Sequence, residues 1–350
     1  MAIRHSRRIH LVALVVVALS ALACLIPGFA FATPKSPAAP RTVAEAQKQL
    51  TDLMRTNSQL VDKYNQARID VAAKQRAADA ARSDAAAAAA AFAQARSAVS
   101  ATVVAQYEGG SFSAAGALLS SHSGQGYLDQ LQALNMISEH NAGVAKQLDV
   151  ARIAAVAATK QADGLLAAAT KRSDELAAQK RTVDGQFAKY TALLASLTAA
   201  QRATYQQTIA PTVTSAVVQL TRASLSAANV PGAAKKAVDY ALAQLGKPYV
   251  YGAAGPDAFD CSGLTMAAYA TAGIGLPHNA AAQYDVGRHV SISALQPGDL
   301  IFYYQPIGHV VIYVGGGMAV SASTEGVPIS EIPIASWDSN QISGATRIVG

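Results

Sequence analysis

A single cysteine in the last third of the chain has neighbours that favour nucleophilic chemistry. Cys261 lies in the stretch Phe-Asp-Cys-Ser-Gly-Leu at residues 259–264, after a loop that contains glycine and proline. The residues that follow are apolar and helix-forming, so we expect Cys261 at the start of a helix. Unpaired backbone N–H groups and the positive end of the helix dipole favour thiolate there. The sequence therefore predicts a reactive thiol.

A histidine 48 residues downstream (309 − 261) supplies a matching base. His309 opens the run Val-Val-Ile-Tyr-Val at residues 310–314, whose residue types predict a strand. A lone cysteine with a distant histidine is the outline of a cysteine hydrolase. The alternative is a buried cysteine that only fills space in the core.

The elements around this pair predict an α+β domain over residues 233–350. A helix is expected over 233–245, ended by Gly246, and further helices follow Cys261 and residue 278. Strands are expected at 299–304, 309–314, 318–322 and 346–349, with a hairpin turn at the three glycines 315–317. Helices first and antiparallel strands afterwards indicate α+β rather than a doubly wound fold.

The N-terminus has the pattern of a secretory signal. Three arginines within the first eight residues precede an apolar stretch over 10–26, and small residues end at Ala32. We expect cleavage after Ala32 and a secreted or cell-envelope protein. A retained membrane anchor is one alternative, and a lipoprotein attached through Cys24 is another.

Removal of residues 1–32 changes both charge and cysteine content. The formal net charge is +6, and the loss of three arginines lowers it to +3 (6 − 3). That balance gives little support for nucleic-acid binding, and we expect no nucleic-acid partner. One of the two cysteines would remain, so no intramolecular disulfide can form, which suggests that the thiol is used.

Residues 42–206 predict a long α-helical coiled-coil hairpin. Thr42 to Gln106 contains no proline or glycine, a Gly/Ser-rich break follows, and helix is expected to resume over 127–206. Residues 33–41 and 207–232 are expected to be linkers. An arm of about 65 residues spans on the order of 100 Å. Dimerisation through these helices is the alternative to a hairpin within one chain.

The first helix has a seven-residue apolar repeat that Asn57 and Lys74 interrupt. A sustained repeat of this kind indicates a helix that wraps a partner helix. The predicted a and d positions are Leu50, Leu53, Leu60, Tyr64, Ala67, Val71, Ala78, Ala81, Ala85, Ala88, Phe92, Ala95 and Val99.

Five blocks of the C-terminal domain, taken in order, resemble the NlpC/p60 family of cell-wall endopeptidases. The blocks are Pro-Tyr-Val-Tyr-Gly at 248–252, Asp-Cys-Ser-Gly-Leu at 260–264, Leu-Pro-His at 276–278, Leu-Gln-Pro-Gly-Asp-Leu-Ile-Phe-Tyr at 295–303 and His-Val-Val-Ile-Tyr-Val-Gly at 309–315. The resemblance covers roughly residues 233–350. It implies a circularly permuted papain-like domain without a cofactor. It also implies hydrolysis of peptidoglycan stem peptides at the D-γ-glutamyl–meso-diaminopimelate bond.

The resemblance assigns catalytic roles by position. Cys261 matches the nucleophile, His309 the general base, and Tyr249 the tyrosine that helps polarise the scissile carbonyl. The family's third residue, usually His and sometimes Asn, Gln or Glu, falls at Ser321. A serine can accept a hydrogen bond from the imidazole but cannot stabilise imidazolium as a carboxylate would. Tyr249 could instead be a core residue.

Substrate contacts are implied for three further residues. Asp260 and Ser262 match the family's contacts to substrate amine and carboxylate groups, and His278 lies in a block that lines the substrate groove. Asp260 could instead serve only as a helix cap. We expect no metal site, because the domain's histidines lack the close spacing of zinc ligands.

An exported coiled coil ahead of this domain resembles the actinobacterial Rip-type and streptococcal PcsB-type division hydrolases. That resemblance implies docking of the coiled coil on the FtsE–FtsX membrane complex during cell division. Our hypothesis is that the arm covers the Cys261 groove until a partner binds, and the alternative is a passive spacer. A non-catalytic wall-binding or division scaffold with a vestigial Cys–His pair is the competing function.

Overall fold

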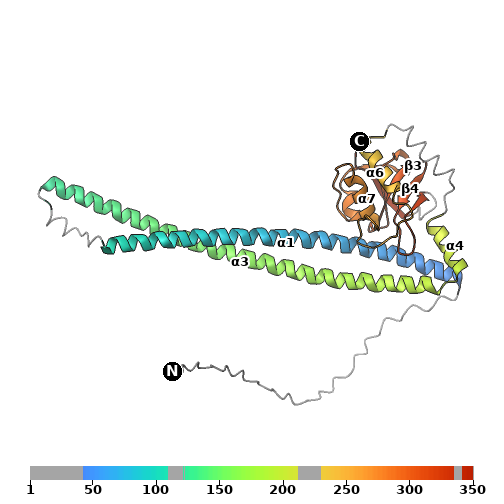
Figure 1. Cartoon of the computed structure of the whole chain (residues 1–350), viewed down its shortest axis with the longest axis horizontal. Helices are drawn as coiled ribbons and strands as arrows, with labels where there is room; N and C mark the ends of the chain where they lie inside the picture. The colour runs from blue at the N-terminus through green and yellow to red at the C-terminus, as the bar shows by residue number, and fades with distance from the viewer. Residues whose placement is uncertain (1–41, 109–120, 122, 212–229, 335–340, 350) are drawn as a thin grey trace, which may run out of the picture. The chain divides into compact units, whose positions relative to one another are not determined.

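The protein consists of a long helical hairpin and a smaller α+β domain. The computed structural model describes residues 42–108, 121, 123–211, 230–334 and 341–349. Helices α1 (Val43–Glu108) and α3 (Gly124–Ser196) lie side by side as an antiparallel pair, and the α+β domain follows them in the chain (Figure 1). The predicted signal, the first linker and most of the second linker lie outside the described residues.

Side-chain caps explain where the hairpin helices begin. Thr42 and Glu45 form a reciprocal pair at the start of α1, in which each side chain accepts the other residue's backbone N–H. Ser123 accepts the N–H of Gly126 at the start of α3. Such caps pair backbone N–H groups that have no partner within the helix.

The second predicted helix is two helices, which corrects the expectation of one helix over 127–206. Helix α3 ends at Ser196, and α4 (Ala199–Ile209) starts after Thr198. The Thr198 hydroxyl accepts the N–H of Gln201, and the Gln201 side chain accepts the N–H of Thr198. This capping box holds Thr198 in an extended conformation that a continuous helix does not allow.

The buried face of α1 only partly follows the predicted repeat. Leu50, Ala67, Ala78 and Ala81 are buried as expected, but Leu60 and Tyr64 are only partly buried. Asn57, which interrupts the repeat, and Ala46, seven residues before Leu53, are also buried. Further buried positions lie off the repeat, and these are Met54, Ser58, Val61, Asp62 and Asn65. The base of α1 therefore buries a wider face than one partner helix requires.

The α+β domain has three α-helices within the described residues and a six-stranded antiparallel sheet. The helices are α6 (Gly232–Leu242), α7 (Cys261–Ala270) and α8 (Ala280–Tyr284). The strands are β1 (Arg288–Val290), β2 (Leu300–Tyr303), β3 (His309–Gly315), β4 (Met318–Ser321), β5 (Ser330–Pro333) and β6 (Ile342–Arg347), in the order β1-β6-β2-β3-β4-β5. Strands β1 and β5, which form the edges, are absent from the sequence prediction.

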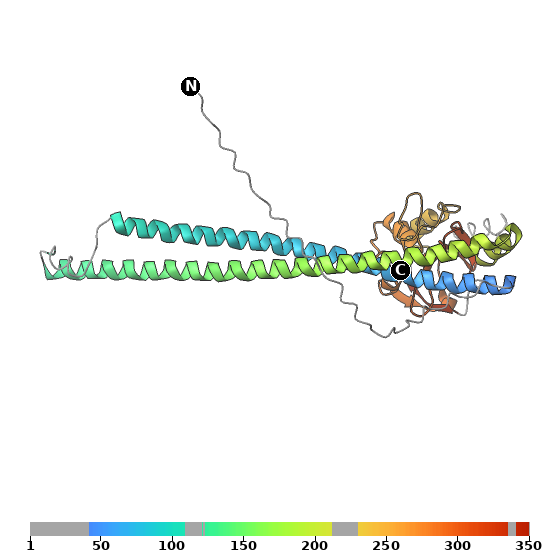
Figure 2. The ribbon, with the colours of Figure 1, turned by 90° about the horizontal axis from the view of Figure 1, so that it is seen from below.

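Both faces of the sheet are buried, and residues of the hairpin contribute to the core on each face. Leu300 and Phe302 of β2 share a core with α6 and α7, whereas Ile301 and Tyr303 share a core with residues of α1, α3 and α4. Side chains alternate between the two faces of a strand, so a strand covered on both faces is apolar throughout. The start of α1 and the end of α3, which form the hairpin base, thus complete the second core of the domain. Figure 2 shows the hairpin base beside the domain.

None of the helices in the described ranges is both long enough and apolar enough to span a bilayer.

Candidate active site

Cys261 is the first residue of α7, and Asp260 caps that helix. The Asp260 side chain accepts the N–H of Gly263 at 2.7 Å, as an N-cap carboxylate does. Gly263 cannot carry a side chain, because a Cβ there would lie 2.1 Å from the carbonyl oxygen of Ala253. The loop before α7 therefore lies directly against the first turn, which fixes the backbone that presents the sulfur atom.

Asp260 collects several donors in a fully buried position. It accepts the N–H of Gly252 at 2.8 Å, and His278 Nε2 lies 2.8 and 3.0 Å from its two oxygens. Burial raises the pKa of this carboxyl, but the hydrogen bonds from His278, Asn65 and Gly263 and the charge of His278 outweigh it, so the pKa lies below its usual value. Asp260 is therefore both a helix cap and a carboxylate beside the nucleophile.

His309 and Ser321 come together from neighbouring strands. His309 opens β3, Ser321 ends β4, and His309 Nε2 lies 3.1 Å from the Ser321 Oγ. The backbone N–H of Val310, the residue after His309, is one of the groups that lower the pKa of Cys261, so the start of β3 lies near the sulfur atom. The role of His309 as the general base of this nucleophile stays a prediction. Burial lowers the pKa of His309 to about 3, so the imidazole is neutral near pH 7.

The thiol is not activated in this state, which corrects the expectation of a favoured thiolate. Cys261 is only 4% exposed, and burial raises its pKa well above the usual value. The charges of Asp260 and Asp62 raise it further, and the N–H groups of Val310 and Ser262 lower it only in part. The helix N-terminus is present, but desolvation and two carboxylates outweigh it.

Tyr249 lies close to Cys261 and also contributes to the core. It is 5% exposed, and burial is the main reason that its pKa is raised, with the charge of Cys261 next. Its ring stacks on Phe187 of α3, with ring centroids 6.3 Å apart. Both roles considered for Tyr249 are therefore compatible with its position.

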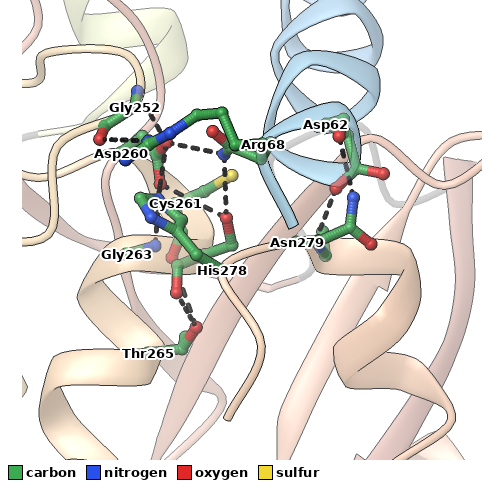
Figure 3. Close-up of polar contacts among 12 residues, drawn as sticks. Asp62, Arg68, Gly252, Asp260, Cys261, Gly263, Thr265, His278 and Asn279 are labelled. Atoms are coloured by element: carbon green, nitrogen blue, oxygen red, sulfur yellow. Dashed lines mark hydrogen bonds and ion pairs between the residues drawn. The ribbon is translucent and has the colours of Figure 1, made fainter. Parts of the chain in front are cut away.

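Helix α1 reaches into this site with polar side chains. The amide nitrogen of Asn65 donates to Asp260 at 2.9 Å and lies 3.5 Å from the Ser262 hydroxyl, and Asn65 is 1% exposed. Arg68 donates to the carbonyl of Gly252 at 2.9 Å. Figure 3 shows α1, in blue, beside Cys261, with the Arg68 side chain directed toward Gly252.

A second set of α1 contacts lies beside α8. The Asp62 side chain accepts the N–H of Ala280 at 2.5 Å, and the amide of Asn279 donates to the backbone carbonyl of Asp62 at 2.8 Å (Figure 3). Burial raises the pKa of Asp62 to about 6, although hydrogen bonds from Ala280, Ala281 and Asn279 oppose the shift. The carboxylate that raises the thiol pKa is therefore held in place by the domain itself.

Helix α3 also contacts the loop before α7, through Tyr251. Phe187 stacks on Tyr251 with ring centroids 5.1 Å apart, and the Tyr251 hydroxyl donates to Asp184. Lys180 lies 3.1 Å from that hydroxyl and 5.7 Å from the ring centroid. Both hairpin helices thus touch the residues around the nucleophile.

The sequence analysis missed the α1 residues in this site. Ser58, Asp62 and Asn65 are spaced four and three residues apart, which places them on one helix face, and all three are buried. A polar stripe with helical spacing, beside an apolar stripe, was the available signal for a second contact surface. Nothing in the pattern indicates which part of the chain covers that stripe.

Within the described ranges, no cluster of three or more His, Cys, Asp or Glu side chains is arranged to hold a metal ion.

A cysteine at a helix N-terminus and a histidine that opens a strand of an antiparallel sheet are typical of the cysteine hydrolase class. Residues 246–346 match the NlpC/P60 family. This part of the chain is an NlpC/P60 domain.

Several curated relatives share this region. A probable endopeptidase of Mycobacterium bovis is 48% identical over 99 residues, which are 28% of this chain and 26% of that protein. A probable endopeptidase of Corynebacterium glutamicum is 41% identical over 122 residues, 35% of this chain and 58% of that protein. The probable endopeptidase p60 of Listeria grayi is 46% identical over 95 residues, 27% of this chain and 19% of that protein. The matches thus span less than two thirds of each relative.

Among solved structures, the P60 domain of an antigen from M. avium subspecies paratuberculosis is similar at 29% identity. The match covers 34% of this chain and 96% of that one, with a TM-score of 0.31.

Proposed function

We propose that this chain is a cysteine endopeptidase of peptidoglycan stem peptides and that its helical hairpin keeps it latent. The NlpC/P60 match and the juxtaposition of Cys261, His309 and Ser321 support the chemistry. The bond expected from the family resemblance is D-γ-glutamyl–meso-diaminopimelate. The latency is supported by one observation above all, the Asn65 amide seated on Asp260 and Ser262 beside a buried Cys261.

The reaction divides into two steps. His309 takes the thiol proton, and the Cys261 sulfur attacks the scissile carbonyl carbon to form a tetrahedral oxyanion. The N–H of Cys261 and the Tyr249 hydroxyl are the donors that we assign to this oxyanion. The protonated imidazole then gives its proton to the leaving amine, and water hydrolyses the thioester.

Asp260 and Ser262 form the site that we assign to a donor group of the substrate. In this structure the group that they hold is an amide N–H₂ from Asn65. An ammonium or amide of the stem peptide would make the same hydrogen bonds, so substrate and Asn65 compete for one place. Release of α1 is therefore required before a substrate can enter.

Gly308 offers a test of latency, because residues of α1 fill the space beside it. A Cβ at Gly308 would lie 2.7 to 2.8 Å from atoms of Gln59 in α1, and Gln59 also donates to the carbonyl of Pro306. Gly308→Ala should therefore displace α1 and raise the rate of stem-peptide hydrolysis about tenfold or more, a change of at least ~1.4 kcal/mol in the closed-to-open balance.

Gly275→Ala is the matched control, because a Cβ there meets no atom within 4 Å. Hydrolysis of a defined muropeptide is followed by mass spectrometry, with Cys261→Ala as the inactive reference. Equal rates for wild type and Gly308→Ala, with a normal thermal unfolding curve, would reject a covering role for the arm. Ser321→Ala should keep a measurable fraction of activity.

A non-catalytic wall-binding or division scaffold is the second candidate function, because a buried thiol is compatible with it as well. Measurements on Gly308→Ala distinguish the scaffold from the endopeptidase. A variant whose Cys261 reacts with iodoacetamide but which cleaves no stem peptide would support the scaffold. Cleavage that Cys261→Ala abolishes supports the enzyme.

The proposal includes a secreted protein acting at the cell wall. Support for export is the N-terminal pattern of residues 1–32, and a releasing partner is expected because the arm occupies the site. The FtsE–FtsX complex is the partner that the resemblance to division hydrolases implies. Release of activity by purified FtsX ectodomain, absent with an unrelated membrane ectodomain, is the corresponding test.

A further inference from the structure

Two serine hydroxyls lie in line behind His309. Ser321 ends β4, and Ser323 follows it by two residues; both side chains are buried. His309 Nε2 is 3.1 Å from the Ser321 Oγ, which is 2.8 Å from the Ser323 Oγ. The imidazole and two hydroxyl groups therefore form a continuous polar chain at a site removed from solvent.

The direction of the hydrogen bonds in this chain decides which nitrogen of His309 can act as a base. A neutral imidazole has one N–H donor and one acceptor nitrogen. Since Nε2 is directed at Ser321, Nδ1 is the nitrogen that must accept the thiol proton, and the ring proton must then be on Nε2. This tautomer requires that Ser321 accept a hydrogen bond from the ring.

A serine alone does not select that tautomer. Its hydroxyl can rotate and either donate or accept, unlike a carboxylate, which only accepts. If Ser321 donated to Nε2, the ring proton would be on Nδ1 and His309 could not accept a proton from Cys261. The Ser321 hydrogen therefore needs another acceptor, and the Ser323 oxygen lies at the required distance.

We propose that Ser323 is a positioning residue that, by accepting a hydrogen bond from Ser321, holds His309 in the Nε2–H tautomer needed for general-base catalysis. The inference rests on the proposed function for its catalytic meaning, but its structural content is independent of activity. Because burial keeps the imidazole neutral near pH 7, its tautomer is the variable that the serines control. The Ser321–Ser323 pair would then supply the directional acceptor that other family members obtain from a single polar residue.

The test reads the tautomer directly in the full-length protein. The chain is labelled with ¹⁵N-histidine, and long-range ¹H–¹⁵N correlation spectra at pH 7 report Nδ1 and Nε2 separately. His309→Gln identifies the His309 signals among the seven histidines. In the wild type we expect mainly the Nε2–H tautomer. In Ser323→Ala we expect the ratio of the Nδ1–H to the Nε2–H tautomer to be at least tenfold higher.

Two further variants separate positioning from a general structural effect. Ser323→Thr keeps the hydroxyl and should keep the wild-type ratio. Ser330→Ala removes a serine from β5, opposite Ser321 in the sheet, and should leave the ratio unchanged. An Nδ1–H tautomer in the wild type, or an unchanged ratio in a folded Ser323→Ala variant, would overturn the proposal.

Activity provides a separate measurement. In the Gly308→Ala background, Ser323→Ala should lower kcat about tenfold without a change in KM, and Ser323→Thr should restore it. An unchanged kcat alongside a shifted tautomer would also overturn the catalytic role. If no variant cleaves stem peptides, the proposed function fails. The tautomer measurement still decides whether Ser323 determines the tautomer of the His309 imidazole.

Discussion

At the scale of single residues, two buried carboxylates both raise the pKa of Cys261, but their own pKa values are shifted in opposite directions. Asp260 caps α7 and has a lowered pKa because donors surround it, so it is a fixed negative charge. Asp62 comes from α1, and burial is the main reason that its pKa is raised. The first belongs to the site permanently, whereas the second is present only while the arm is docked.

The raised pKa of Asp62 predicts a pH-dependent stability. Its pKa is about 6 here against an ordinary 3.8, so its contribution to stability is fully present below pH 4 and is lost as the pH rises through 6. Asp62→Asn keeps an acceptor for the Ala280 N–H but removes the buried charge. At pH 7.5 the variant should therefore be more stable than the wild type, by at most about 3 kcal/mol.

Thermal unfolding followed by circular dichroism at pH 7.5 and pH 4 measures this effect. The Tm of Asp62→Asn should exceed that of the wild type by several degrees at pH 7.5, with little difference at pH 4. Asp149→Asn, at an exposed site on α3, is the control and should show no such trend. The same Tm difference at both pH values would contradict the assignment.

At the scale of elements, α1 serves two partners at once. Its apolar stripe packs on α3, and its polar stripe contacts the α+β domain, which is why buried positions depart from a single heptad repeat. Asn57 is buried in this region, and neither of its amide atoms has a hydrogen-bond partner among the described residues. An unpaired buried amide costs roughly 1–3 kcal/mol, so it weakens the docked state.

Asn57→Leu should therefore strengthen docking of α1. We expect a higher Tm and a severalfold slower reaction of Cys261 with iodoacetamide at pH 8, because removal of the unpaired amide stabilises the closed state. Gln75→Leu also replaces an amide side chain by leucine, at an exposed position of α1, and should alter neither measurement. Faster labelling of a well-folded Asn57→Leu variant would show that Asn57 favours closure.

Local patterns predicted the central elements and missed those that depend on distant contacts. The apolar strands β2, β3 and β4 and the start of α7 at Cys261 follow from residue types and spacing. The edge strands β1 and β5 are short and partly polar, and β5 ends in proline, so neither has a strong strand signal. The break at Thr198 was visible in its Thr-x-x-Gln cap but was outweighed by the surrounding helical pattern.

The candidate site shows the same limit. Cys261 and His309 could be placed from their sequence contexts, and Asp260 was predicted as a contact residue, with a helix cap as the alternative. Asn65 and Asp62 could not, because their partners lie about two hundred residues away in the sequence. Their spacing marks a helix face but does not identify what that face contacts.

At the scale of the whole chain, burial is uneven along the hairpin. Among the described residues, buried side chains of α1 extend only to Ala81, and those of α3 begin at Ala155. The segments 82–108 and 124–154 are alanine-rich or expose large apolar side chains, including Met136 and Ile153. Local opening is easier where few apolar contacts must be broken.

Hydrogen–deuterium exchange should therefore follow a gradient along the hairpin. Amides in 82–108 and 124–154 should exchange at least tenfold faster than those in 46–81 and 169–194, where packing on the second core adds protection. Mass spectrometry of peptic fragments gives the comparison within a single sample. Equal protection along both helices would mean that the outer half has a partner, such as a second copy of the chain.

Because Asn65 binds Asp260 and belongs to the same chain, α1 acts as a tethered ligand of the site. A tethered group has an effective concentration commonly in the millimolar range, so a free peptide competes against it at a disadvantage. If about one molecule in a hundred were open, any ligand would bind about a hundredfold more weakly than to the bare groove. Inhibitor screens on the intact chain would then chiefly rank compounds by how well they displace Asn65 from Asp260.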